Sequence, residues 1–292
     1  MNVNRNKLLM RLRIESKQKE NQNKPPLISS DVVQVKDFKY TKLFEHLGDS
    51  GQLLLAKRKN DCSEQYLVKH AYTDCACNEF VYTKLAQAMG YSMPEAVLFQ
   101  ASSKNDLSRF TTEYIIGERY LNIVNACPSY EEIRDQAVNW NDYFAFHALY
   151  AMTGESDGVE ILFADDNLIY RVDTTDAFPI TNRCLDLAGV DVDFDGITPN
   201  DAIKKVLLSS DFSQVLNPYD CDSYLELCLS QNPDCLKYFL EPFARIQEIR
   251  ADYIDSFLNT LCYFYPDFIG EYFKKYLFAL KTNAAKYLKE KQ

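Results

Sequence analysis

The sequence predicts an α+β fold with two lobes, a small β-rich lobe with one helix followed by a larger helical lobe. Short apolar runs separated by polar turns, which are typical of strands, fill residues 31–118 around a single helical stretch. From residue 119 onwards, apolar residues recur at helical spacing. The 292 residues are enough for one large domain or two such lobes. We therefore expect a small lobe at 31–118 and a helical lobe at 119–292.

The first 30 residues differ from the rest and are expected to form a basic arm and a linker. Residues 4–24 are basic and polar, and Pro25 and Pro26 close this stretch. Residues 7–14 have the pattern of two helical turns with one apolar face, but arginines interrupt the apolar run, which argues against a secretory signal. A flexible arm or a short docked helix is favoured, and a helix lying on a membrane surface is the alternative.

In the small lobe we expect a hairpin, one helix and two further strands. The runs at 53–57 and 65–69 are separated by a polar stretch, which suits a hairpin. Apolar residues at helical spacing predict a helix over 75–89 that Gly90 ends. Strands are expected at 96–99 and 110–116, and Gly117 is expected to end the lobe. In the helical lobe we expect helices at 139–152, 200–209, 222–230, 234–259 and 266–288.

Residues 154–178 carry the acids on which any chemistry is expected to depend. A loop with Asp157 and Glu160 precedes two short apolar runs joined by a polar turn, and the second run ends at Asp173. Two such runs form a hairpin, which brings the acid at its entrance beside the acid at its exit. Three carboxylates held close together repel one another unless a cation lies between them. Mg²⁺, together with the phosphates of a nucleotide, is the expected occupant.

A lysine and a glutamate in the small lobe complete the set. Lys69 is the last residue of an expected strand, and Glu79 lies ten residues later in the expected helix. The two can pair across the lobe, which would point the ammonium at phosphate oxygens. One phosphate-binding lysine with an orienting glutamate, one candidate base and two metal ligands follow one another in the order that phosphoryl transfer uses.

These residues resemble the atypical branch of the protein-kinase superfamily, which contains the HipA-like and phosphoinositide-kinase-like enzymes. The resemblance rests on Tyr66-Leu67-Val68-Lys69, on Asn78-Glu79-Phe80, and on Met89-Gly90-Tyr91-Ser92-Met93-Pro94-Glu95. Together they are similar to the HipA-like pattern of a strand lysine, an "NE" helix and a "G-hydrophobic-x-x-P-E" segment. The similarity covers roughly residues 31–180 and implies a bilobal protein kinase-like fold.

The resemblance also implies roles for individual residues. Lys69 would hold the α and β phosphates of ATP, and Glu79 would orient it. Asp157 would accept the proton of the acceptor hydroxyl, and Asp173, with Glu160, would bind Mg²⁺. Backbone groups of Glu113, Tyr114 and Ile115 would hold the adenine. The implied activity is an ATP- and Mg²⁺-dependent phosphotransferase acting on a protein substrate, as a Ser/Thr protein kinase.

Three departures from the family pattern keep an alternative open. No His or Arg stands near Asp157, and Glu160 occupies the place where the family usually has an Asn. No GxGxxG precedes the lysine strand. The alternative is a pseudokinase-type module that binds a nucleotide or a partner without phosphotransfer. Lipid phosphorylation and nucleotidyl transfer stay open as well, because a fold does not fix a function.

Composition excludes some classes of protein. The net charge of −10 argues against nucleic acid as the main partner, because that affinity depends on clustered Lys and Arg. No apolar run approaches the 18 residues of a membrane span. Nine scattered cysteines without a CxxC predict reduced thiols and a cytoplasmic protein, and a secreted effector role stays open. Residues 191–196 resemble the start of an EF-hand, but we interpret them as an acidic turn because position 12 would be Ala202.

Overall fold

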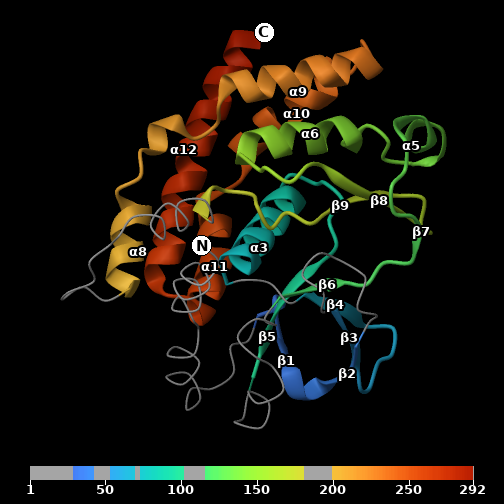
Figure 1. The fold of residues 1–292 in the computed structure, drawn as a ribbon, viewed down its shortest axis with the longest axis vertical. Helices are drawn as coiled ribbons and strands as arrows, with labels where there is room; N and C mark the ends of the chain where they lie inside the picture. The colour runs from blue at the N-terminus through green and yellow to red at the C-terminus, as the bar shows by residue number, and fades with distance from the viewer. Residues whose placement is uncertain (1–28, 43–52, 70–72, 102–115, 181–198, 292) are drawn as a thin grey trace, which may run out of the picture.

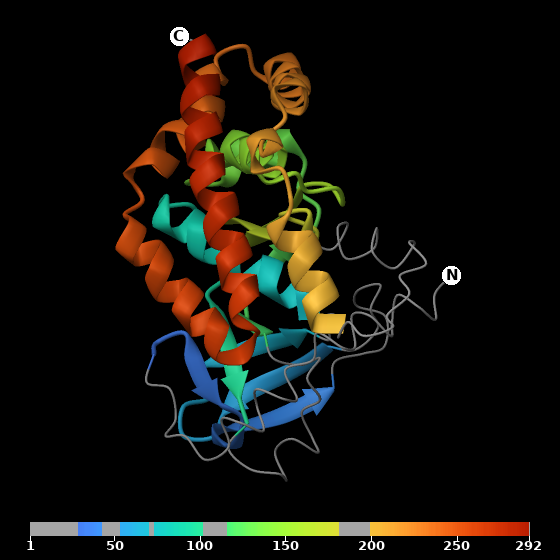
Figure 2. The same ribbon diagram turned by 90° about the vertical axis from the view of Figure 1, so that its left-hand side faces the viewer.

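The computed structural model describes residues 29–42, 53–69, 73–101, 116–180 and 199–291, and the statements below concern these residues. A β-sheet lies at one end of the molecule and helices form the rest (Figures 1 and 2). The arm at 1–28 and the acidic turn at 191–196 lie outside the described residues. The architecture is the expected α+β arrangement of a small β-rich part and a larger helical part.

The small lobe contains a six-stranded sheet in the order β1-β5-β6-β4-β3-β2. The predicted hairpin is present, since β3 and β4 pair antiparallel with Leu53 opposite Lys69. Only β1 and β5 run parallel to each other. Gly117 lies inside a strand rather than at the end of the lobe, so that expectation was wrong. The strands are β1 (Val32–Gln34), β2 (Phe38–Lys42), β3 (Leu53–Arg58), β4 (Gln65–Lys69), β5 (Ala96–Gln100) and β6 (Ile116–Arg119).

A second sheet of three strands, in the order β7-β8-β9, follows directly. The strands β8 (Glu160–Ala164) and β9 (Ile169–Val172) form the predicted hairpin, with Glu160 opposite Val172. The third strand, β7 (Ile123–Asn125), was not predicted, because its three side chains are exposed or half-exposed and show no apolar alternation. Residues 120–122 therefore connect the two sheets.

The helix of the small lobe, α3 (Thr73–Ala88), matches the predicted one within two residues at its start and one at its end. Its side chains from Ala76 to Ala86 are buried on every face. Such a helix lies inside a core rather than on its surface. It packs against β5 on one side and against α11 (Ala251–Phe264) on the other.

The helical lobe is built around α12 (Asp267–Lys291), which runs along most of the molecule (Figure 2). The single helix expected at 234–259 was wrong, because Ile249 and Arg250 adopt extended backbone conformations and separate two helices. The other helices lie close to their predicted positions, except a short helix at 130–136 that was not predicted. They are α5 (Tyr130–Gln136), α6 (Asp142–Thr153), α8 (Pro199–Leu208), α9 (Pro218–Gln231) and α10 (Leu236–Glu248).

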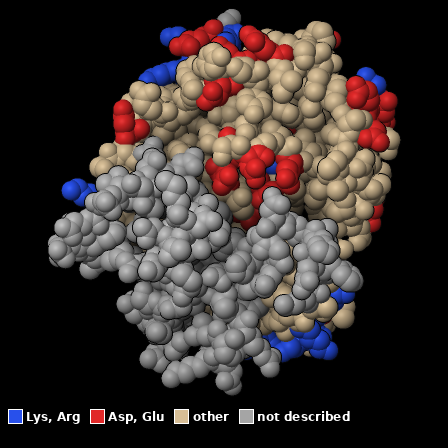
Figure 3. Space-filling view, in the orientation of Figure 1, with Lys and Arg blue, Asp and Glu red and all other residues tan. Residues whose placement is uncertain are grey.

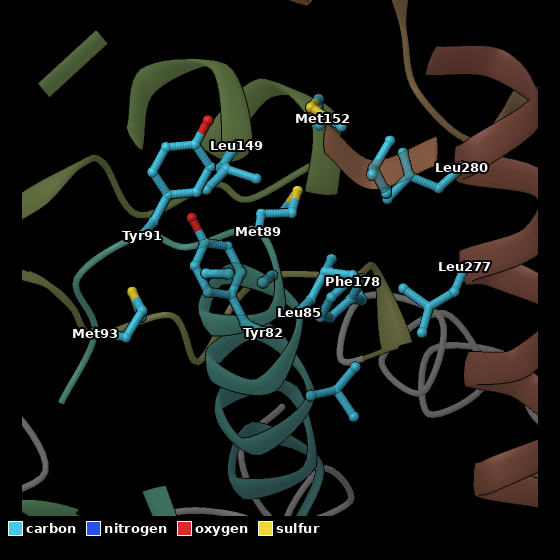
Figure 4. Close-up of a cluster of buried hydrophobic side chains, with 14 of the residues drawn as sticks. Tyr82, Leu85, Met89, Tyr91, Met93, Leu149, Met152, Phe178, Leu277 and Leu280 are labelled. Atoms are coloured by element: carbon cyan, nitrogen blue, oxygen red, sulfur yellow. The ribbon is translucent and has the colours of Figure 1, made fainter. Parts of the chain in front are cut away.

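The main hydrophobic core joins α3 to the helical lobe. Figure 4 shows Tyr82 and Leu85 of α3 beside Leu149 of α6, with Leu277 and Leu280 of α12 nearby. A smaller core lies within the sheet of the small lobe and includes Phe38, Tyr66 and Phe99, whose rings pack edge to face.

The described cysteines agree with the expectation of reduced thiols. Four are buried, Cys77, Cys221, Cys228 and Cys235, and Cys62, Cys127 and Cys262 are exposed or half-exposed; none of these seven forms a disulfide. Within the described parts of the chain, no helix has both the length and the apolar composition needed to cross a membrane.

Candidate active site

The predicted pair of Lys69 and Glu79 is formed. Lys69 ends β4, and its ammonium contacts the Glu79 carboxylate of α3. The Glu79 side chain is completely buried, and that of Lys69 is 15% exposed. A strand lysine and a helix glutamate therefore meet where the sheet faces α3.

A second carboxylate, which the sequence analysis missed, shares the same ammonium. Glu118 of β6 places Oε2 2.9 Å from Lys69 Nζ, and its side chain is 5% exposed. Glu118 lies opposite Leu67 on the neighbouring strand β4. Because side chains alternate along a strand, Leu67 and Lys69 share one face, and Glu118 projects from that same face. Only the pairing of β4 with β6 reveals this, because the four residues of β6, Ile-Gly-Glu-Arg, carry no pattern that marks Glu118.

The charges in this buried group are unbalanced. Burial would lower the pKa of Lys69, but the negative charges of Glu118, Glu79 and Asp173 raise it above its ordinary value. Burial, followed by the like charge of Glu118, raises the pKa of Glu79 although Lys69 opposes the shift. Lys69 is thus firmly protonated, and two buried carboxyl groups share its single positive charge.

The acids of the hairpin do not form the metal-holding group of three that was expected. Within the described residues, no group of three His, Cys, Asp or Glu side chains lies close enough to hold a metal ion. The expectation of three crowded carboxylates was therefore wrong. Asp157 is exposed, three residues before β8 begins at Glu160, and Asp173 directly follows β9. Because Glu160 pairs with Val172, the hairpin brings Glu160, rather than Asp157, next to the residue that precedes Asp173.

The acids nevertheless interact electrostatically. Loss of solvent around Glu160 and the charges of Asp173 and Asp157 raise the pKa of Glu160 above its ordinary value. The negative charge of Asp173 also raises the pKa of Lys69, after the larger effects of Glu118 and Glu79. Asp173 therefore interacts with charged residues of both sheets, Lys69 in the first and Glu160 in the second. Acidic side chains gather near the middle of the face shown in Figure 3. Such a surface is suited to a divalent cation or to a ligand that brings one with it.

Asp173 itself is held in an unusual conformation. Its φ is +53°, a left-handed value that Asp tolerates better than most residues. Thr175 Oγ1 donates a hydrogen bond to Asp173 Oδ1 at 3.2 Å, and Asn78 Nδ2 of α3 donates to the Thr175 carbonyl at 2.7 Å. Asn78 precedes Glu79, so α3 supports both the lysine cluster and the segment after Asp173.

A buried ion pair lies beneath the loop that carries Asp157. Arg171 of β9 and Glu155 are in contact, and both side chains are completely buried. Burial raises the pKa of Glu155 to about 8, although the positive charge of Arg171 acts in the opposite direction. Sequence reasoning missed both residues. A charged residue within a short apolar strand was the signal for Arg171.

The residues predicted to hold adenine lie outside the described residues. Glu113, Tyr114 and Ile115 precede β6, whereas the connection between the two sheets is formed by residues 120–122, after β6. Tyr120, in this connection, is 44% exposed, and its backbone N–H donates to the Gln65 carbonyl at 2.9 Å. The segment that joins the lobes thus lies several residues later than the predicted one.

The fold is similar to that of a solved kinase. One match is the crystal structure of a Helicobacter pylori proinflammatory kinase, CtkA, with 12% sequence identity and a TM-score of 0.51, covering 87% of this chain and 98% of that chain. No protein-family model and no curated protein matches the chain. At this identity the similarity shows the fold alone. It confirms the predicted bilobal kinase-like architecture.

Proposed function

We propose that this chain is an ATP- and Mg²⁺-dependent phosphotransferase that phosphorylates Ser or Thr hydroxyls of a protein substrate. The observation that carries the proposal is the buried Lys69 ammonium, which Glu79 and Glu118 hold at the end of β4 within the field of Asp173. A lysine fixed in this way can contact the phosphates of a nucleotide without having to be ordered first. Pre-positioned charge is the main means by which proteins catalyse phosphoryl transfer.

Asp173 and Glu160 would hold Mg²⁺, as the sequence predicts. The residues fit this ion, because both offer hard carboxylate oxygens. Loss of solvent, and then the negative charge of Asp173, raises the pKa of Glu160, and a bound cation would offset that charge. A third protein ligand is not required, since Mg²⁺ in nucleotide enzymes is usually bound by one or two carboxylates, with phosphates and waters completing the shell. When bound, Mg²⁺ would neutralise charge on the phosphates.

Asp157 would act as the base. The acceptor hydroxyl oxygen attacks the γ-phosphorus, and Asp157 takes the hydroxyl proton. The bond between the γ-phosphorus and the oxygen that bridges it to the β-phosphate breaks, and ADP leaves with that oxygen. The exposed position of Asp157 leaves a protein substrate free to approach. Backbone groups of residues 120–122, rather than those of Glu113, Tyr114 and Ile115, would hold the adenine, since these residues join the two sheets.

A second candidate is a module that binds a nucleotide or a partner protein without phosphotransfer. The lack of a GxGxxG before the lysine strand favours it. Replacement of the family's Asn by Glu160 points the same way. The first candidate requires nucleotide binding and the second allows it, so binding alone does not separate them.

The test compares Asp157→Asn and Asp173→Asn with the wild-type protein in a Mg²⁺- and ATP-dependent autophosphorylation assay and in transfer to casein. Loss of the base or of the metal ligand is expected to lower the rate by about 100-fold or more. Removal of Mg²⁺ with a chelator should have the same effect.

Asp166→Asn is the matched control, because Asp166 is an exposed acid of the same hairpin, in the turn at its opposite end. It should retain wild-type activity. Thermal-shift titration with ATP and Mg²⁺ should show binding that Lys69→Ala weakens. If the wild type binds ATP but transfers no phosphate to itself or to casein, the phosphotransferase is rejected and the binding module is supported.

A further inference from the structure

The backbone N–H and the backbone carbonyl of Gly158, the residue after Asp157, each form a hydrogen bond with a buried side chain. Arg171 Nη2 donates a hydrogen bond to the Gly158 carbonyl at 2.9 Å. The Gly158 N–H donates to the hydroxyl of Tyr150, on α6, at 3.2 Å. Tyr150 belongs to α6 and Arg171 to β9, so Gly158 is hydrogen-bonded both to the helical lobe and to the hairpin.

Arg171 also binds the rest of the loop. Its Nη1 donates to the Glu160 carbonyl at 3.0 Å and to the carbonyl of Val172, and its Nη2 contacts the Glu155 carboxylate. One guanidinium therefore touches the start, the middle and the end of residues 155–160. A guanidinium is bonded to Gly158, the residue that follows Asp157, although no arginine is near Asp157 in the sequence.

Packing alone does not account for a completely buried arginine. Removing a charge from water costs several kcal/mol, and a hydrophobic side chain of similar volume would fill the space without that cost. The cost is offset only because Arg171 finds a carboxylate and three carbonyl oxygens. All of these acceptors belong to the loop or to the strands beside it, so the contacts of Arg171 specify the shape of this loop.

The loop backbone depends on glycine for its conformation rather than for space. Gly158 has a φ of +90°, and a Cβ placed on it would meet no atom within 4 Å among the described residues. An alanine there would be strained by its backbone but would collide with nothing. Gly158→Ala therefore changes the loop backbone and leaves every contacting side chain in place.

We propose that Arg171 and Tyr150 are positioning residues that fix the Gly158 residue and thereby the neighbouring base, Asp157. This inference rests on the proposed function. Asp157 is exposed, so its location depends on the loop backbone rather than on packing around its side chain. A displacement of about 1 Å in a catalytic group can lower a rate about 100-fold. Loosening the loop at Gly158 should lower kcat and leave the KM for ATP unchanged, because Lys69, which is proposed to bind the phosphates, lies in the other lobe. Loss of the Arg171 contacts also reaches the carbonyls of Glu160 and Val172, next to the proposed Mg²⁺ ligands, so it should change both parameters.

Three variants loosen the loop in different ways. Arg171→Lys keeps the charge but loses the planar fork that reaches several carbonyls. Tyr150→Phe removes only the hydroxyl that accepts from Gly158. Gly158→Ala strains only the backbone. We expect kcat for MgATP-dependent autophosphorylation to fall roughly 10- to 100-fold in Arg171→Lys and Gly158→Ala, and less in Tyr150→Phe. The KM for ATP should stay within about twofold of wild type in Gly158→Ala and Tyr150→Phe.

Two controls match these changes outside the loop. Tyr276→Phe removes a buried hydroxyl that donates to the Thr153 carbonyl at 3.1 Å, in the helix before the loop. Gly154→Ala places a side chain at φ +66°, again without a clash. Tyr276→Phe should lose about as much stability as Tyr150→Phe, and Gly154→Ala about as much as Gly158→Ala. Both controls should keep the wild-type kcat. Hydrogen exchange of the backbone amides at 156–160, measured on every protein, reports the loop itself and does not require activity.

Faster exchange at 156–160 together with a selective loss of kcat supports the proposal. Unchanged exchange in Arg171→Lys and Gly158→Ala overturns it, whether or not the protein is active. Faster exchange with a kcat equal to that of the controls also overturns it, since the loop would then be ordered without positioning the base. Absence of phosphotransfer in the wild type is a separate result: it rejects the proposed function, and the catalytic role assigned to Arg171 and Tyr150 falls with it.

Discussion

At the scale of single residues, the buried lysine with two acids is the feature with the clearest electrostatic consequence. Lys69 needs one carboxylate to be neutralised, and it has both Glu79 and Glu118. Glu79 Oε2 and Glu118 Oε1 are buried and have no hydrogen-bond partner among the described residues. The excess negative charge opposes the arrival of phosphate groups at the lysine that is proposed to bind them.

Replacing Glu118 by Gln should therefore strengthen ATP binding. The substitution preserves size, removes one negative charge beside Lys69 and leaves the pair with Glu79 in place. Unit charges separated by about 7 Å interact by roughly 2 kcal/mol at an effective dielectric constant near 20, and partial screening would leave about a tenfold decrease in the Kd for MgATP. Isothermal titration of both proteins measures this change.

Glu131→Gln, which neutralises an exposed acid on α5, serves as the control and should leave the Kd unchanged. Glu79→Gln should weaken binding, because it removes the carboxylate that contacts Lys69 from α3. If Glu118→Gln weakens binding as much as Glu79→Gln does, then Glu118 orients the lysine instead of competing with phosphate for it.

The pair of Lys69 and Glu79 could be predicted from the sequence, but the second acid beside Lys69, Glu118, could not. A strand lysine followed by a helix glutamate is a pattern of residue type and order. Glu118 joins the pair only through the register of β4 and β6, which pairs Leu67 with Glu118. Arg171 was missed for the same reason, because its partners are mainly backbone carbonyls, which no sequence pattern marks.

At the scale of elements, the division of the helix expected at 234–259 has a tertiary cause. Neither Gly nor Pro stands at Ile249 or Arg250, so no sequence signal marks the break. Lys281 Nζ, on α12, donates to the Ile249 carbonyl at 2.7 Å, and Gln247 Nε2 donates to the Lys281 carbonyl at 2.8 Å. The bond from Lys281 satisfies a backbone carbonyl where α10 ends, and the bond from Gln247 ties this end of α10 to α12. A new helix, α11, then begins and also packs against α12.

The contact between α11 and α12 is close at one glycine. A Cβ on Gly270 would lie 2.3 Å from Cys262 Sγ. Alanine normally stabilises a helix interior by about 0.5–1 kcal/mol relative to glycine. Here Gly270→Ala should instead lower the free energy of unfolding, by about 1–3 kcal/mol, because the helices must separate or the thiol must move. Denaturant unfolding measures the effect.

The double variant with Cys262→Ala tests the cause. Removing the sulfur takes away the clashing atom, so the pair should be more stable than Gly270→Ala alone by most of that loss. A stabilising Gly270→Ala would mean that the two helices are further apart than described. Additive effects in the double variant would place the strain somewhere other than at Cys262.

At the scale of the whole molecule, the sequence predicts the two lobes better than it predicts how they are joined. Periodicity identified β3, β4, β5 and most of the helices because each carries a local pattern. It could not show that α3, assigned to the small lobe, is buried on every face and packs against α11. Further contacts cross the lobes, since Gln100 Nε2 donates to Tyr263 Oη at 2.8 Å and Arg245 Nη1 donates to the Met89 carbonyl at 2.5 Å.

A shared core predicts that the lobes unfold together. Phe99→Ala removes a ring from the small core of the sheet, where Phe99 packs on Phe38 and Tyr66, and should cost about 3–5 kcal/mol. Trp140, the chain's single tryptophan, reports on the helical lobe, where it packs on Tyr238 with ring centroids 5.4 Å apart. If α3 couples the lobes, Phe99→Ala should lower the midpoint of the Trp140 fluorescence transition by roughly 10 °C. The same substitution at the more exposed Phe278 should lower it far less. A Trp140 midpoint unchanged by Phe99→Ala would show that the sheet unfolds on its own, with α3 remaining in the helical lobe.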